Sequence, residues 1–100
     1  MSGLIVSVSH RLPQDEALRR IQAMVARART QYSDKINDLR ESWNGYVGAF
    51  LVSAMNQQAS GTVTVNPSEV TVRTTLPLLA LGFKPMIESR IREILTRILA

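Results

Sequence analysis

Residues 43–76, WNGYVGAFLVSAMNQQASGTVTVNPSEVTVRTTL, decide the fold, because they contain three successive signals for antiparallel connections. The first is Asn44-Gly45, and Asn-Gly between apolar runs is typical of a β-hairpin. The second is a break over residues 56–61. The third is the turn Asn66-Pro67-Ser68-Glu69, where proline presets the backbone angle. We therefore predict consecutive strands over residues 36–43, 46–55, 62–65 and 70–76.

The strand over residues 46–55 is unusual because both of its faces are apolar. Tyr46, Phe50 and Val52 share one face, whereas the opposite face carries Val47 and Leu51. One face of an antiparallel sheet commonly meets water and is then polar. We therefore expect the face with Tyr46, Phe50 and Val52 to contact the returning helix, another subunit or a ligand.

A further strand and two helices flank this region. The strand covers residues 4–9, with Leu4, Val6 and Val8 toward the core, and the first helix begins at Pro13 and runs to about residue 31. The last helix begins near residue 84, with isoleucines and leucines at helical spacing. The order is β-α-β-β-β-β-α. It predicts an α+β fold, an antiparallel sheet of about five strands with two helices on one face and the first strand beside residues 70–76.

Composition limits the class of protein. The chain has 100 residues, which suits one domain over 1–100, with 45% hydrophobic and 20% charged residues, as in ordinary globular proteins. It has no cysteine, so disulfides and cysteine-based metal sites are excluded. No signal peptide or membrane-spanning segment is evident, and we expect a soluble cytoplasmic protein.

A basic run precedes the second strand, and the net charge is +4. Its four arginines fall between Glu16 and Asp34 with no intervening acid: Arg19, Arg20, Arg27 and Arg29. Such a basic patch could bind nucleic acid or another anionic partner, but more often it only solvates the outer face of a helix. Tyr46 and Phe50 around Gly48 also loosely resemble an RNA-binding aromatic strand, although no second aromatic strand accompanies them.

Signals for catalysis are weak. His10 is the only histidine, and no acidic or nucleophilic partner for it can be predicted. Asp34 and Asp38 are the only nearby pair of carboxylates for a metal, and they fall at predicted element ends, where acids are common. Phosphate-binding loops and nucleophile elbows are missing from the sequence. We expect no enzymatic activity, no metal and no cofactor.

The order of landmarks resembles the polyhydroxyalkanoic acid system family of small bacterial proteins. The landmarks are a strand ending in His10 before a helix, Trp43-Asn44-Gly45, Ser60–Val65, a Val-x-Val strand, a leucine-rich connector, and Ile87-Glu88, Ile91-Arg92 and Leu95. The resemblance implies association with polyhydroxyalkanoate storage, at the granule surface. It carries over no catalytic residues.

We therefore interpret the chain as a non-enzymatic binding or structural protein that adsorbs to granules or self-associates as a homodimer through apolar surface. The expected surface combines one face of the 46–55 strand with the connector: Tyr46, Phe50, Val52, Leu78, Leu79 and Leu81. Two alternatives stay open. One is a nucleic-acid-binding module that uses the arginines, and the other is a carrier of a small hydrophobic ligand enclosed by the sheet and the last helix.

Overall fold

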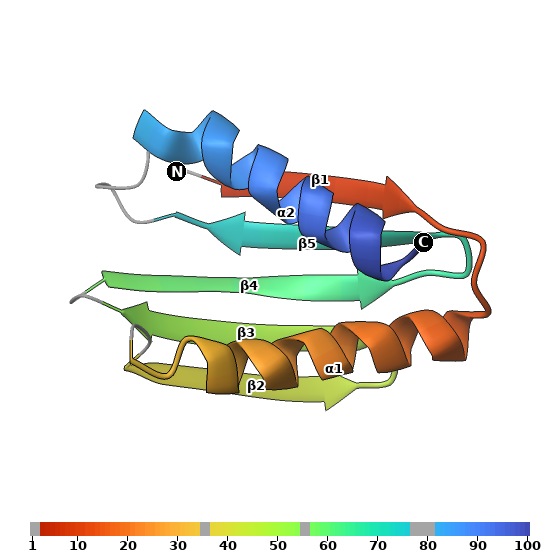
Figure 1. Ribbon diagram of the computed structural model, residues 1–100, viewed down its shortest axis with the longest axis horizontal. Helices are drawn as coiled ribbons and strands as arrows, with labels where there is room; N and C mark the ends of the chain where they lie inside the picture. Colours follow the sequence, from red (N-terminus) through yellow and green to blue (C-terminus); the bar gives the residue numbers. More distant parts are fainter. Residues whose placement is uncertain (1–2, 35–36, 55–56, 77–81) are drawn as a thin grey trace.

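The computed structural model describes residues 3–34, 37–54, 57–76 and 82–100. It contains a five-stranded sheet and two helices in the predicted order (Figure 1). The elements are β1 (Gly3–Ser9), α1 (Gln14–Gln31), β2 (Asp38–Asn44), β3 (Val47–Ala54), β4 (Gln57–Val65), β5 (Glu69–Thr75) and α2 (Lys84–Ile98).

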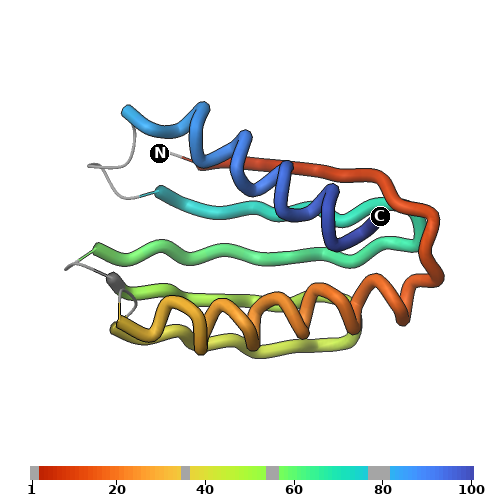
Figure 2. Tube along the Cα trace, viewed as in Figure 1, coloured from red at the N-terminus to blue at the C-terminus, as the bar shows by residue number. Residues whose placement is uncertain are grey.

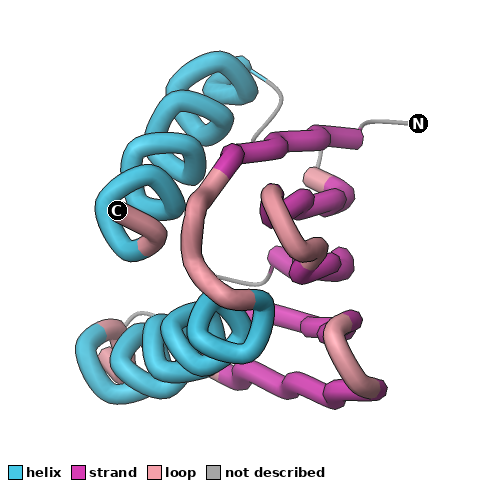
Figure 3. The backbone as a smooth tube through the Cα atoms, turned by 90° about the vertical axis from the view of Figure 1, so that its right-hand side faces the viewer, coloured by secondary structure: helices cyan, strands magenta, loops and turns pink. Residues whose placement is uncertain are grey.

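The sheet has the strand order β1-β5-β4-β3-β2, and every neighbouring pair is antiparallel. Consecutive hairpins connect β2 to β5, and β1 pairs with β5 as predicted. Both helices lie on the same side of the sheet (Figure 3). The predicted α+β fold is therefore confirmed.

The core lies between the sheet and the helices. Strand β1 alternates strictly, with Leu4, Val6 and Val8 buried and Ile5 56% exposed on the opposite face. Because antiparallel partners share a face, the register Val6–Val72–Val63 continues this buried row across the sheet. The helices complete the core through Ile21 of α1 and other buried side chains, chiefly Ala17, Leu95 and Leu99.

Two predicted connections between strands differ in the structure. Asn44 pairs with Val47, so the first hairpin loop is Gly45-Tyr46 and not Asn44-Gly45. Gly45 has a φ of +62°, which glycine adopts without a steric penalty. The predicted break over residues 56–61 is wrong for residues 57–61, because β4 begins at Gln57. Pairing with β3 and β5 holds this polar segment in the sheet despite its weak strand propensity.

The helices are not parallel. They approach each other where α2 ends and diverge toward the start of α2 and the end of α1 (Figure 2). The close end is fixed by Arg20 of α1, whose Nη1 donates hydrogen bonds to the carbonyl oxygens of Ile98 (3.0 Å) and Ala100 (2.8 Å). Where the helices diverge, side chains of the sheet and of both helices line an open space.

Candidate functional site

An apolar groove of about 300 Å³ lies between α1 and α2. Its floor is formed by the inner face of the sheet, and its walls are the two helices. Every described residue that lines it is apolar: Met24, Val25, Ala28, Leu39, Phe50, Val52, Val63, Val72, Ile91, Ile94 and Leu95. Pockets of this size and chemistry suit apolar ligands.

The groove exists because α1 and α2 diverge and because a small side chain of α1 faces the space above the sheet. Ala28, in the last turns of α1, supplies only a methyl group to the lining. Met24 on one wall and Ile94 on the other are only half-buried, although the apolar periodicity of each helix directs them inward. These apolar side chains would be fully buried in a closed core, but they remain partly exposed in the groove.

The structure separates the residues predicted as one interaction surface. Phe50 and Val52 line the groove, where both are half-buried. Tyr46 lies in the β2–β3 hairpin loop, away from that lining, and its hydroxyl donates a hydrogen bond to Asp15 of α1. This bond raises the pKa of Tyr46. The connector residues Leu78, Leu79 and Leu81 lie outside the described residues.

The face of β3 that carries Val47 and Ala49 points away from the helices. Val47 is 43% exposed there, and Ala49 is also exposed. On the helix side, Phe50 faces the groove and not open solvent, so it offers no stacking platform of the kind that RNA-binding sheets present.

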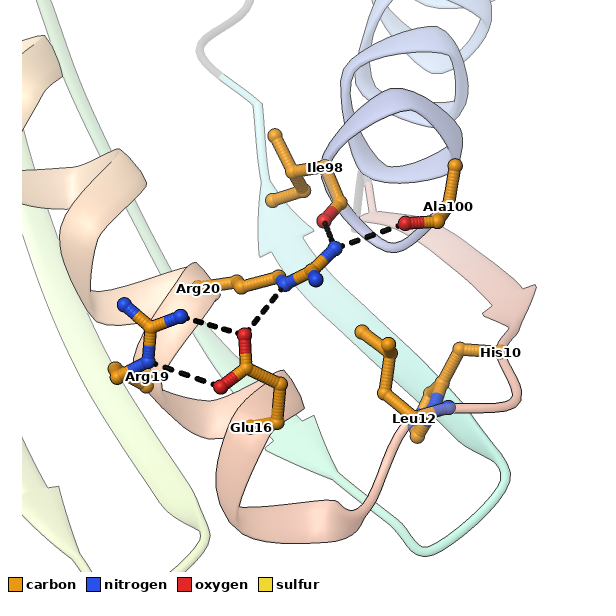
Figure 4. Close-up of polar contacts among 7 residues, drawn as sticks. All are labelled: His10, Leu12, Glu16, Arg19, Arg20, Ile98 and Ala100. Atoms are coloured by element: carbon orange, nitrogen blue, oxygen red, sulfur yellow. Dashed lines mark hydrogen bonds and ion pairs between the residues drawn. The ribbon is translucent and has the colours of Figure 1, made fainter.

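The predicted arginine patch is divided among several contacts. The carboxylate of Glu16 accepts hydrogen bonds from Arg19 Nε (3.0 Å) and Arg20 Nε (2.8 Å), and Arg20 continues to the end of α2 (Figure 4). Arg29 donates to the carbonyl of Leu39 at 3.0 Å and lies 3.5 Å from the carboxylate of Glu41. Two of the four arginines therefore connect α1 to other elements.

The same contacts give Glu16 an unusual acidity. Hydrogen bonds from Arg19 and Arg20 lower the pKa of Glu16 from 4.5 to about 2. A carboxylate whose pKa is lower in the folded state stabilises the fold above the unfolded pKa, and this contribution disappears as the pH falls through the folded pKa.

Glu16→Gln should therefore remove a stabilising contribution that is fully present above pH 4.5 and lost by about pH 2. We expect the difference in the free energy of unfolding between wild type and Glu16→Gln to shrink as the pH falls through this window. Urea titrations at several pH values measure it, with Glu69→Gln as the control for net charge. A difference that stays constant from pH 6 to pH 2 would contradict the prediction.

Arg27 lies in a second, basic pocket. Arg19, Arg20 and Arg27 of α1 line it with Ala23 and with Arg97 and Ile98 of α2, and its volume is about 530 Å³. Arg27 has no acidic partner among the described residues, whereas the Arg97 guanidinium lies 3.1 Å from the Glu93 carboxylate. Arg97 is not part of the predicted basic patch, because it belongs to the other helix.

His10 is buried and holds two loops together. Its Nδ1 accepts a hydrogen bond from the Leu12 amide at 3.1 Å, so its Nε2 carries the proton and donates to the Asn66 carbonyl at 3.0 Å. Both ring nitrogens are thereby occupied by backbone groups. Of the two carboxylates considered for a metal, Asp38 accepts a hydrogen bond from Arg40, and Asp34 is exposed. The described residues contain no cluster of three potential metal ligands.

Comparison with known proteins gives one family. The model of the family described as "Putative polyhydroxyalkanoic acid system protein" matches residues 4–99. No curated protein matches the chain. The crystal structure of TTHA0849 from Thermus thermophilus is similar with a TM-score of 0.46 and 12% identity, over 97% of this chain and 93% of that chain. Among the described residues, neither helix has the length and apolar character needed to cross a bilayer.

Proposed function

Since the chain belongs to the polyhydroxyalkanoic acid system protein family, we propose that it is a non-enzymatic cytoplasmic protein that binds polyhydroxyalkanoate granules through the groove between α1 and α2. The observation that carries the proposal is the groove itself, whose described lining is wholly apolar. A polyhydroxyalkanoate is a polyester with alkyl side groups, so its surface is also apolar. Each methylene that leaves water on binding contributes about 0.8 kcal/mol.

The absence of an enzymatic role is part of the proposal. Phe50, Val52 and Ile91 in the groove offer no nucleophile, acid or base. His10, the one histidine, is committed to backbone hydrogen bonds at the loops. Binding without bond cleavage is the activity that this lining supports.

Self-association is a second part of the proposal. The sheet face that points away from the helices exposes Ile5 and Val47. Threonines on β4 and β5 share this face, which makes it less apolar than the groove. A homodimer formed through it would leave the groove of each copy free, and light scattering of the purified chain measures this association.

Filling the groove tests the granule proposal. In Ala28→Leu the larger side chain should occupy the space that α1 leaves over Phe50, because Ala28 lines the groove. Ala26→Leu is the matched control, since Ala26 is exposed on the same helix and lies outside the groove lining. In cells that accumulate polymer, we expect wild type and Ala26→Leu in the granule fraction and Ala28→Leu mostly in the soluble fraction.

Both variants should stay folded, because leucine is a good helix former and neither change introduces a buried polar group. Circular dichroism and thermal unfolding check this. Wild-type protein that remains wholly soluble in granule-rich cells would refute the proposal. Equal granule binding by Ala28→Leu and Ala26→Leu would show that the groove is not the binding surface.

A further inference from the structure

The basic pocket and the apolar groove are lined by neighbouring residues of the same two helices. On α1, Arg27 lines the basic pocket, and Met24, about one turn earlier on the helix surface, lines the groove. On α2, Ile98 lines the basic pocket, and Leu95, one turn earlier, lines the groove. Guanidinium groups therefore lie beside the apolar groove, and we call the groove and this basic rim together the cleft.

Positive charge at this rim exceeds the acids that could neutralise it. Glu16 forms ion pairs with both Arg19 and Arg20. Glu93 forms ion pairs with both Arg90 and Arg97. The Arg97 side chain is 74% exposed, so an incoming anion can reach it. Arg27 is exposed and without an acidic partner in the described part of the chain.

We infer that the cleft binds a free medium-chain alkanoate, with the alkyl chain in the groove and the carboxylate at Arg27 and Arg97. This inference rests on the proposed function only in taking the groove as the binding site. Arginine binds carboxylates through paired, charge-assisted hydrogen bonds, which a neutral alkyl chain cannot form. The apolar lining, in turn, selects against ligands that are polar along their length.

The volume of the groove sets the length of the chain. A group the size of a water molecule occupies about 30 Å³, and a methylene is of similar size. The groove of about 300 Å³ therefore accommodates about ten such groups. A single alkyl chain of about that length is therefore the ligand that the groove suggests.

Calorimetry with decanoate, decanol and decylammonium, each below its aggregation concentration, tests the inference. We expect wild type to bind decanoate more tightly than either of the other two. Arg27→Ala combined with Arg97→Ala should weaken decanoate binding at least tenfold and leave decanol binding unchanged. Arg73→Ala, on the sheet face that points away from the helices, is the matched control and should bind decanoate as wild type does.

Three results would overturn the inference: equal binding of all three ligands, an equal loss of decanoate and decanol binding in the double variant, or no decanoate binding. The granule experiment separates these failures from failure of the proposed function. If Ala28→Leu abolishes granule association while decanoate does not bind, the granule proposal stands and the alkanoate inference falls. If decanoate binds as expected and the wild-type protein does not associate with granules, the alkanoate inference stands and the granule proposal falls.

Discussion

Gly61→Ala is expected to destabilise the chain by about 3 kcal/mol or more, a large part of the stability of a small domain. A Cβ atom at this position would lie 2.1 Å from the carbonyl oxygen of Arg73 and 2.8 Å from the Cα of Thr74. Both are backbone atoms of β5, which pairs with β4 at this point. Relief of the clash would require separating two central strands of the sheet.

Gly48→Ala is the matched control, because the same methyl group meets a side chain there. Its Cβ would lie 2.8 Å from ring atoms of Trp43, and a side chain can shift more readily than the backbone of a paired strand. We expect this variant to lose about 1 kcal/mol and to shift the fluorescence of Trp43, the only tryptophan. Urea denaturation measures both variants. Equal stability of Gly61→Ala and wild type would show that β4 and β5 can separate at little cost.

Local patterns were sufficient to predict the order of elements. Alternation in Leu4–Val8 and the turn residues around Pro67 depend only on neighbours in sequence, and the structure confirms both. The segment 57–61 was missed because its glutamines and Gly61 have weak strand propensity. Its place in the sheet depends on backbone pairing with β3 and β5, which no local pattern reveals.

The groove could be predicted only in part. The two-sided apolar strand identified Phe50 and Val52, but helical periodicity gives the same signal for a wall residue such as Met24 as for a core residue such as Ile21. What distinguishes them is the divergence of the helices. It depends on contacts such as that of Arg20 with the Ile98 carbonyl, which are remote in sequence.

Leu95→Ala is expected to lower the free energy of unfolding by about 3 kcal/mol. Leu95 is only 1% exposed and belongs to the core, yet it also lines the groove. Its truncation removes packing against the sheet and adds the space of three carbon atoms to an existing cavity. Ile94→Ala is the control from the next position on α2, and because Ile94 is half-buried we expect a loss of about 1 kcal/mol.

The two variants should also differ in ligand preference if the groove holds an alkyl chain. The extra space in Leu95→Ala lies at the buried base of the α2 wall, so it should favour dodecanoate over decanoate. Ile94→Ala opens the half-buried part of the same wall and should weaken the binding of both. Urea titration and calorimetry on the same samples measure the two effects. A Leu95→Ala protein as stable as wild type would mean that α2 moves inward to close the cavity. The volume of the groove would then depend on the size of the side chain at position 95 and not on the divergence of the helices.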